Sequence, residues 1–291
     1  MNSGITGHTR LLALFGAPVA HSGSPAMHNF SFQKLGLDYV YLCLESQKED
    51  MERAFANVRA YNMPGGNITM PCKTVSVQYM DELSPAAELI GAVNTFVQKD
   101  GHITGHNTDG IGFVRNLKEH GIEVAGKKIT VCGAGGAATA ILAQCALDGA
   151  KELVIFKRKN ATFAQTQAMA ERIGRRCPDC SLRVLDFSDE EALTREIRSS
   201  DILVNATSVG MKPNEGETVV KDKSAFYPGL VVCDAVYNPL ETRLLREAKE
   251  CGCICVGGKG MLLWQGVEAF KLFTGCEMPV EEVKAKFYPE L

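Results

Sequence analysis

The second half of the chain alternates short apolar segments with longer helical patterns, and this alternation constrains the fold more than any other feature. Parallel strands cannot be joined by tight turns and need crossovers of a dozen or more residues, usually helices. The alternation therefore predicts a parallel sheet with right-handed crossovers. The predicted strands are 128–132, 153–156, 182–186, 202–205 and 230–235, and the predicted helices between them are 135–147, 163–173 and 189–197.

A glycine-rich turn, Gly133-Ala134-Gly135-Gly136-Ala137-Ala138, joins the first of these strands to its helix. Gly133 permits a tight turn, and Gly135 lets backbone N–H groups approach a pyrophosphate. The N-terminus of the helix adds partial positive charge and free donors. This strand, turn and helix predict a dinucleotide site, and a glycine-rich turn without a ligand is the alternative. The cofactor residues predicted here are Gly133, Ala134, Gly135, Gly136 and Ala137.

The next predicted strand ends in Lys157-Arg158-Lys159-Asn160. NAD sites usually carry an acidic residue near this point, where it binds the ribose 2′-hydroxyl. Three adjacent cations instead favour a 2′-phosphate, which Arg158 can bind through two parallel hydrogen bonds. The run therefore predicts NADP. NAD stays open, because Asn160 can hydrogen-bond a ribose hydroxyl, and the run can also be an ordinary basic surface loop.

The first half of the chain carries four polar clusters at the ends of predicted strands or the starts of predicted helices. In open α/β folds this edge of the sheet binds ligands. Serine, threonine and asparagine both donate and accept hydrogen bonds, which suits a polyhydroxylated ligand. Lys73 can hold a carboxylate or transfer a proton, and Asp109 can accept from a hydroxyl, although Ser24 and Asp109 also suit helix N-caps. The clusters are 21–25, 67–73, 91–95 and 105–110.

These patterns predict an α/β protein of two domains. A smaller α/β substrate domain is expected over 1–110, with predicted strands and helices that lead into a hairpin around Asp100-Gly101. A Rossmann-like, doubly wound NAD(P)-binding domain is expected over 111–261, and helices within 262–291 are expected to pack back on the first domain. The predicted strands of the first domain are 11–15, 39–44 and 67–68, and its predicted helices are 25–35 and 49–60.

Composition excludes several classes of protein. The chain has 291 residues, of which 45% are hydrophobic and 22% charged, as in soluble globular proteins. A net charge of −3 argues against a nucleic-acid partner. The uncharged stretch 129–147 contains the glycine turn, so no membrane association is expected and the location is predicted to be cytoplasmic. The odd count of 11 cysteines predicts reduced thiols, and the Cys177–Cys180 spacing lacks the second pair that a metal site would need.

Seven ordered motifs make the chain resemble the shikimate dehydrogenase family, in particular its quinate/shikimate dehydrogenase branch. The resemblance covers nearly the whole length. The motifs are GAPVAHSGSP at 16–25, TMPCK at 69–73, GAVNT at 91–95, NTDG at 107–110, NATSVGM at 205–211, YNP at 237–239 and GMLLWQG at 260–266.

The resemblance implies reversible, NAD(P)-dependent reduction of 3-dehydroshikimate to shikimate, in aromatic amino acid biosynthesis through chorismate. Lys73 would donate and accept the proton, paired with Asp109. Shikimate or 3-dehydroshikimate, with quinate as a further candidate, would contact Ser22, Ser24, Tyr41, Thr69, Lys73, Asn94, Asp109, Tyr237 and Gln265. NADP or NAD would contact residues 134–137, Lys157, Arg158, Lys159, Asn160, Ser208, Ala235 and Gly258. A homodimer stays open.

Two positions depart from the family pattern, and three alternatives remain. Cys72 stands at a variable position just before Lys73, and a thiol there could make the site sensitive to oxidants. The basic run at 157–159 stands where strict NADP enzymes carry Asn-Arg-Thr. The alternatives are a quinate dehydrogenase of quinate catabolism, a metabolite sensor without turnover, and a methylenetetrahydrofolate dehydrogenase. A methylenetetrahydrofolate dehydrogenase has a similar architecture, but its pterin substrate stacks on aromatic side chains, and the chain has Trp264 as its single tryptophan.

Overall fold

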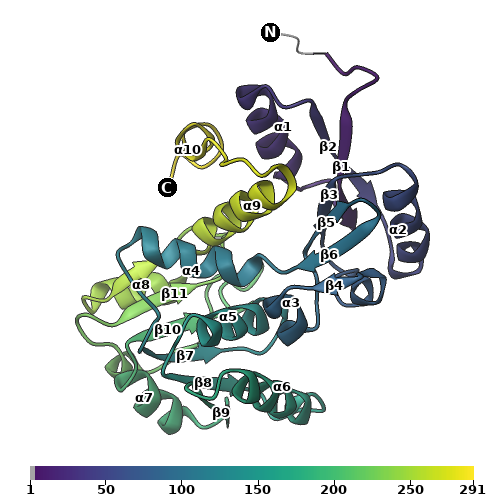
Figure 1. Ribbon diagram of the computed structural model, residues 1–291. Coiled ribbons are helices and arrows are strands. Elements are labelled where there is room, and N and C mark those ends of the chain that lie inside the picture. The colour runs from purple at the N-terminus through teal and green to yellow at the C-terminus, as the bar shows by residue number, and fades with distance from the viewer. Residues whose placement is uncertain (1–3) are drawn as a thin grey trace. The chain divides into compact units, whose positions relative to one another are not determined.

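The computed structural model describes residues 4–291 and divides into two compact units. Unit 1 comprises the chain up to Thr108 together with Gln265–Leu291, and unit 2 comprises Asp109–Trp264. Each unit contains a six-stranded sheet with helices packed beside it (Figure 1). The predicted α/β class with a Rossmann-like parallel sheet is confirmed.

The sheet of unit 1 has the strand order β2-β1-β3-β5-β6-β4. β1 pairs in parallel with both β2 and β3, whereas β3 pairs antiparallel with β5. β5 and β6 form the predicted hairpin, and its turn residues Asp100 and Gly101 both have positive φ, as a two-residue hairpin turn requires. The strands are β1 (Arg10–Gly16), β2 (Tyr39–Glu45), β3 (Gly65–Ile68), β4 (Glu82–Leu83), β5 (Thr95–Lys99) and β6 (His102–His106).

Four helices and most of a fifth pack in unit 1. Helix α1 begins at Ser24, but its N-cap is Gly23, and no side chain of the described residues caps it, so the predicted cap role of Ser24 is wrong. Near the C-terminus, Phe287 packs edge-on against Phe30 of α1, with ring centroids 5.5 Å apart, and Figure 1 shows α10 beside α1. The helices are α1 (Ser24–Leu35), α2 (Met51–Ala60), α3 (Pro85–Ile90), α9 (Gly258–Thr274) and α10 (Val280–Phe287), with 3₁₀ turns at Lys48–Asp50 and Val75–Tyr79.

His28 of α1 is buried in an aromatic cluster of unit 1. Its ring stacks on Tyr41 with centroids 4.6 Å apart, and Phe270 and Phe273 of α9 lie at 6.1 and 5.8 Å. Nδ1 of this histidine has no hydrogen-bond partner among residues 4–291. Burial lowers the pKa of His28 to about 3, so the imidazole is neutral and acts as an apolar ring in the core.

The sheet of unit 2 is entirely parallel, with the strand order β12-β11-β10-β7-β8-β9. Counted from β7, this is the doubly wound order 3-2-1-4-5-6, whose switch point lies between β7 and β10. The strands are β7 (Lys128–Cys132), β8 (Glu152–Lys157), β9 (Ser181–Asp186), β10 (Ile202–Asn205), β11 (Val231–Asp234) and β12 (Ile254–Val256). The helices are α4 (Asp109–Glu119), α5 (Gly136–Leu147), α6 (Phe163–Arg176), α7 (Glu190–Arg198) and α8 (Arg243–Glu250), with a 3₁₀ turn at Lys223–Ala225.

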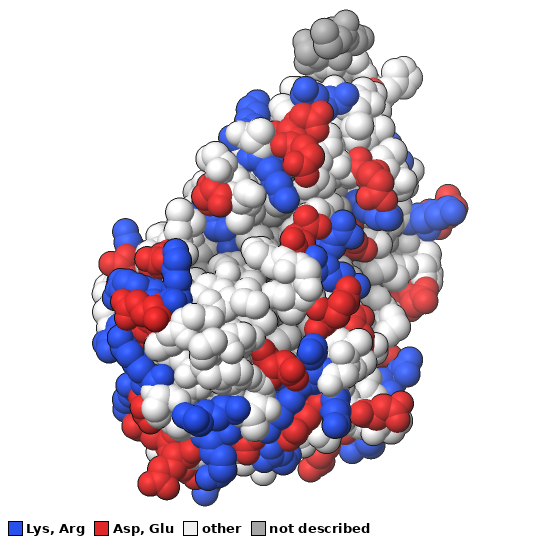
Figure 2. Space-filling view, turned by 90° about the vertical axis from the view of Figure 1, so that its left-hand side faces the viewer, with Lys and Arg blue, Asp and Glu red and all other residues white. Residues whose placement is uncertain are grey.

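The surface carries both signs of charge in similar amounts. Lys and Arg are interspersed with Asp and Glu over the face drawn in Figure 2, in keeping with the net charge of −3. Within residues 4–291, no helix is both long enough and apolar enough to cross a membrane.

Gly66 in β3 gives a test of the packing in unit 1. A Cβ atom at this position would lie 2.3 Å from the Ala13 carbonyl oxygen and 2.8 Å from the Phe96 ring. Because the carbonyl belongs to a neighbouring strand that cannot move aside, Gly66→Ala is expected to lower the free energy of unfolding by about 2 kcal/mol or more. Urea unfolding measures the change.

Gly174 in α6 provides the matched control. A Cβ atom there would make only an ordinary 3.7 Å contact with Leu182. Gly174→Ala is therefore expected to raise the free energy of unfolding by up to about 1 kcal/mol, through helix propensity. Equal effects of the two substitutions would contradict the packing argument.

Candidate active site

A buried chain of hydrogen bonds crosses the strand ends of unit 1. The Tyr41 hydroxyl donates to Asn67 Oδ1 at 2.7 Å. The Asn67 amide donates to the Thr95 hydroxyl at 2.9 Å and to the Asn94 carbonyl at 3.2 Å. The Thr95 hydroxyl donates to Asn94 Oδ1 at 2.9 Å. These four side chains are all buried, so each bond is shielded from water and fixes the orientation of its partners.

Thr108 completes this network at the end of unit 1. Its backbone N–H donates to Asn94 Oδ1 at 2.8 Å, and the Asn94 amide donates back to the Thr108 hydroxyl at 3.1 Å. Asn94 was predicted as a substrate residue, and the network holds its side chain in one orientation. Asn67, Thr95 and Thr108 were not assigned roles, and the only signal for them was their place inside the predicted polar clusters.

Two predicted serines lie at the other end of the same network. The Ser22 hydroxyl accepts from the Ser24 backbone N–H at 3.3 Å, and the Ser24 side chain lies near enough to the Tyr41 phenol to influence its pKa. Tyr41 is fully buried, and this burial raises its pKa, so the phenol stays protonated. The structure thus brings Ser22, Ser24, Tyr41 and Asn94 together, while contact of Tyr41 with a ligand stays a prediction.

The turn that carries Lys73 is tied to the same edge of the sheet. Thr69 donates its backbone N–H to the Phe15 carbonyl at 2.8 Å, and Val93 donates to the Lys73 carbonyl at 2.9 Å. Gly16, at the end of β1, has a φ of 149°, and a Cβ there would lie 2.4 Å from Thr69 Cγ2. The turn therefore packs against β1 and holds half-buried Lys73 beside the segment that leads to Asn94.

The other predicted substrate residues lie on three different elements. Gln265 belongs to the part of α9 in unit 1. Asp109 is the first residue of α4 and of unit 2, and directly follows Thr108. Tyr237, also in unit 2, follows β11 and is 46% exposed. Their roles, like the pairing of Lys73 with Asp109, stay predictions.

The glycine turn of unit 2 has the geometry that a dinucleotide requires. Gly133 has a φ of 116°, and a Cβ there would lie 2.7 Å from the Ala206 carbonyl oxygen, so only glycine fits. A Cβ on Gly135 or Gly136 would meet no atom of residues 4–291 within 4 Å, so this stretch of backbone is open to a ligand. Within the same range no side chain caps α5, which leaves the N–H donors of its first turn for an anionic group.

A buried carboxylate organises the loops after β10 and β11. The Asn205 amide donates to Asp234 Oδ1 at 2.9 Å, and the Thr242 hydroxyl donates to Asp234 Oδ2 at 2.7 Å. The Val236 backbone N–H donates to the same Oδ1 at 2.9 Å, and Asn205 Oδ1 accepts from the Thr207 hydroxyl at 2.7 Å. These bonds fix the chain on either side of two predicted cofactor residues, Ser208 and Ala235, and the sequence did not predict the role of Asp234.

Gly258 approaches the same edge of the sheet from α9. A Cβ on Gly258 would lie 2.7 Å from the Ala235 carbonyl oxygen, so the two predicted cofactor positions are in direct contact. The end of β8 carries the predicted cations. There Asn160 Oδ1 accepts from the backbone N–H and hydroxyl of Thr162, at 3.1 and 2.9 Å, and so closes a local turn.

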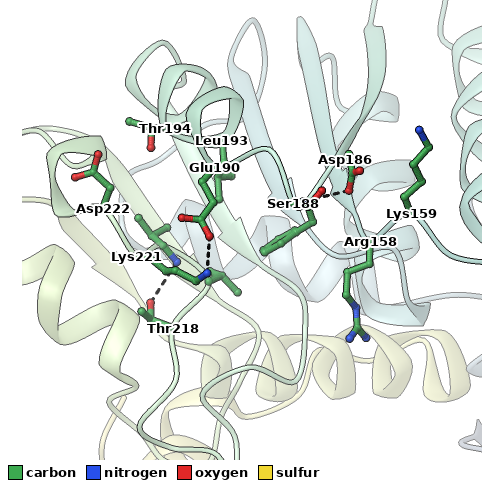
Figure 3. A pocket seen from close by; sticks show the side chains of 13 residues that line it. Arg158, Lys159, Asp186, Ser188, Glu190, Leu193, Thr194, Thr218, Lys221 and Asp222 are labelled. Atoms are coloured by element: carbon green, nitrogen blue, oxygen red, sulfur yellow. Dashed lines mark hydrogen bonds and ion pairs between the residues drawn. The ribbon is translucent and has the colours of Figure 1, made fainter.

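A cavity of about 510 Å³ lies beside the end of β8 (Figure 3). Arg158 and Lys159 line it from the segment just after β8, and Asp186 lines it from the end of β9. Residues of α7 and of the extended segment 218–222 form the opposite wall. Lys157 and Asn160 are not among the residues that line this cavity.

All eleven cysteines are free thiols. Cys72, beside the predicted catalytic lysine, is fully buried, and its Sγ donates to the Ser46 carbonyl at 3.5 Å. Burial raises the pKa of this thiol, which disfavours the reactive thiolate. In the described part of the chain, no three His, Cys, Asp or Glu side chains are grouped so that they could hold a metal ion.

Two family profiles match the chain. Residues 14–96 match the profile described as the shikimate dehydrogenase substrate binding domain, and residues 258–286 match that of the shikimate 5′-dehydrogenase C-terminal domain. Among curated proteins, the shikimate dehydrogenase (NADP(+)) of Listeria monocytogenes serotype 4b (strain F2365) is 51% identical over 280 residues, which is 96% of each chain.

Two further relatives cover almost the whole chain. The quinate/shikimate dehydrogenase of Escherichia coli O139:H28 is 44% identical over 280 residues, covering 96% of this chain and 97% of that protein. A crystal structure of shikimate 5-dehydrogenase from Listeria monocytogenes, in complex with shikimate and NAD, has a TM-score of 0.96 and 50% identity, and the match covers 99% of each chain.

The Asp234 carboxyl makes the stability of unit 2 depend on pH. Burial raises its pKa to about 6, so in the folded state it holds a proton that the unfolded chain releases near its ordinary value. The associated stability is therefore complete below about pH 4 and is lost as the pH rises through 6. Asp234→Asn cannot ionise and can still accept from Asn205, so it should lack this loss of about 1–3 kcal/mol.

Urea unfolding of the wild type and the variant from pH 4 to 7.5 measures this difference. Asp179→Asn, which changes an exposed carboxylate in a turn, serves as the control and should follow the wild type. Parallel profiles for all three proteins would mean that Asp234 ionises as freely in the folded state as in the unfolded chain.

Proposed function

Because the chain belongs to the shikimate dehydrogenase family, we propose that it reversibly reduces 3-dehydroshikimate to shikimate with NADP or NAD. Unit 1 is the proposed substrate domain, and unit 2 is the proposed dinucleotide domain. The reaction would serve aromatic amino acid biosynthesis through chorismate.

The observation that carries the proposal is the buried network from Tyr41 through Asn67 and Thr95 to Asn94 and Thr108. Burying so many polar side chains is favourable only when every group finds a partner, as happens here. The network fixes hydroxyl and amide groups at a sheet edge, beside the turn that bears Lys73. Such groups suit the carboxylate and hydroxyls of a small cyclic acid better than an apolar ligand.

Lys73 is the proposed acid and base. A bound nicotinamide would supply hydride to the substrate carbonyl carbon or accept it from the carbinol carbon. In reduction, the Lys73 ammonium gives its proton to the carbonyl oxygen, which becomes the hydroxyl, and in oxidation the neutral amine takes that proton back. Asp109 is its proposed partner and would orient the ammonium. Ser22, Ser24, Thr69, Asn94 and Gln265 would hold the substrate, with Tyr41 and Tyr237 as further lining residues.

The residues of unit 2 fit a dinucleotide. Gly135 and Gly136 have open backbone at the N-terminus of α5, where a pyrophosphate would meet free N–H donors. Arg158 and its neighbours would hold the adenosine ribose. Ser208 and Ala235 lie on loops that the Asp234 hydrogen bonds hold, and Gly258, the first residue of α9, packs against Ala235. These three residues would line the nicotinamide end.

Quinate is the second candidate substrate, because one relative is named quinate/shikimate dehydrogenase. Quinate carries an additional hydroxyl on the carbon that bears the carboxylate, so one polar neighbour can decide between the two acids.

Initial rates test the proposed function directly. Shikimate and quinate, each with NAD⁺ and NADP⁺, form a matrix of four assays followed at 340 nm, and shikimate is expected to turn over with at least one cofactor. Ligand binding by calorimetry without any change in absorbance would instead support the metabolite sensor. If only quinate turned over, quinate and not shikimate would be the substrate.

Lys73→Ala is expected to lower kcat by roughly 10²–10⁴, because proton transfer is lost, while KM for shikimate changes less. Lys99→Ala, at the far end of β5 in an exposed hairpin, is the matched control and should keep full activity. A variant that loses binding but keeps its turnover would make Lys73 an anchor for the carboxylate instead.

The rate of the oxidation step should rise toward alkaline pH, because that direction needs a neutral amine and lysine is ordinarily a cation at neutral pH. Single-turnover oxidation of shikimate between pH 7 and 10 measures this dependence. A flat profile in the wild type would argue against Lys73 as the base.

A further inference from the structure

Asp186 lies beside the cationic segment that follows β8, although 26 residues or more separate it from that segment in sequence. β8 and β9 are parallel, and their register pairs Lys157 with Asp186. The Phe187 backbone N–H donates to the Lys157 carbonyl at 3.1 Å, which fixes this register at the carboxyl edge of the sheet. The acidic residue missing from the end of β8 is thus present at the end of the neighbouring strand.

The carboxylate is held in place and stays charged. The Ser188 backbone N–H donates to Asp186 Oδ1 at 3.1 Å. The bonds from Ser188 and, to a lesser extent, the Lys159 cation lower the pKa of Asp186. Asp186 is therefore an anion at neutral pH, next to two of the cations that would bind a 2′-phosphate.

The charges that line the cavity balance one another. Glu190 and Lys221 form an ion pair on the wall opposite Asp186 (Figure 3). Asp222 accepts from the backbone N–H and hydroxyl of Ser224. A site built for a 2′-phosphate dianion would be expected to carry a net positive charge. Three cations and three anions line the cavity: Arg158, Lys159, Lys221, Asp186, Glu190 and Asp222.

We propose that Asp186 is a specificity-determining residue for the cofactor, which weakens binding of a ribose 2′-phosphate and accepts a hydrogen bond from a ribose 2′-hydroxyl. In doubly wound folds the adenosine ribose lies at the end of the second strand, which is β8 here. A carboxylate at this point repels the phosphate and competes with it for Lys159, whereas a hydroxyl can donate to it. The inference rests on the proposed function, since it needs a dinucleotide in unit 2.

The consequence is that the basic run does not by itself select NADP. Arg158 and Lys159 attract a 2′-phosphate, and Asp186 offsets that attraction by about one charge. The wild-type protein should therefore discriminate between the two cofactors by no more than about tenfold. The sequence alone predicts a stronger preference for NADP, because the register of β8 and β9 is not visible in it.

Calorimetry with two cofactor fragments tests the proposal without turnover. Adenosine 2′,5′-bisphosphate carries the 2′-phosphate and 5′-AMP lacks it. Asp186→Asn keeps an oxygen that can accept from Ser188 but removes the charge, and should shift the ratio of the two dissociation constants by about tenfold toward the bisphosphate. Asp179 lies just before the start of β9, at the other end of the strand from Asp186. Asp179→Asn removes the same amount of charge and should leave the ratio within twofold of the wild type.

A ratio that Asp186→Asn leaves unchanged, in a variant with the wild-type melting temperature, would overturn the proposal. So would an equal shift in Asp179→Asn, because the effect would then reflect total charge and not position.

Initial rates separate this inference from the proposed function. If wild type turns over shikimate and Asp186→Asn raises the kcat/KM ratio of NADP⁺ to NAD⁺, both proposals are supported. If the wild type turns over and the ratio stays constant, only the role of Asp186 fails. If neither fragment binds and neither cofactor supports turnover in the wild type, both proposals fail together.

Discussion

The side chain of Asn94 holds the candidate substrate edge of unit 1 together. Its oxygen accepts from the Thr108 backbone N–H and the Thr95 hydroxyl, and its amide donates to the Thr108 hydroxyl. Its backbone carbonyl accepts from the Ile68 N–H, and its own N–H donates to His106. A single residue thus joins the ends of β3, β5 and β6. Removing its side chain would leave several buried groups unsatisfied, each at a cost of about 1–3 kcal/mol.

In unit 2 a buried carboxylate joins the ends of neighbouring strands, as the Asn94 amide does in unit 1. Asp234 accepts from Asn205, Val236 and Thr242, and so ties together the ends of β10 and β11 and the start of α8. In both units several of the groups proposed to meet ligands, among them Lys73 and Ser208, sit on turns, and buried polar side chains nearby supply the rigidity. Turns without such support would present the same residue types in many orientations and would bind a small ligand weakly.

The elements that the sequence predicts well are those with long and strong patterns. β7 and β10 match their predicted bounds, and β8 and β9 extend theirs by one or two residues, because each is a short strand pattern between helices of clear period. β4, α3 and β12 have two, six and three residues, too few to show a period, and were missed.

The sequence predicts site residues that belong to one motif. It does not predict pairs of residues that are distant in sequence and meet only in the folded structure. Asn205 and Asp234 are 29 positions apart, and Tyr41 and Asn67 are 26 apart, so no local spacing reveals either pair. The helix cap at Ser24 was wrong for a related reason. A serine before a proline fits a cap, but Gly23 takes that position and Ser24 is the first residue of the helix.

The two units respond to acid in opposite directions, because His28 is buried in unit 1 and Asp234 is buried in unit 2. The pKa of His28 in the folded state is about 3, below the ordinary value of the imidazole. On acidification the unfolded chain therefore binds a proton that the folded state does not, and the free energy of unfolding of unit 1 falls between about pH 6.5 and 3. Asp234 works in the other direction, since its retained proton favours the native form of unit 2 as the pH falls toward 4. Mild acid should therefore weaken unit 1 relative to unit 2.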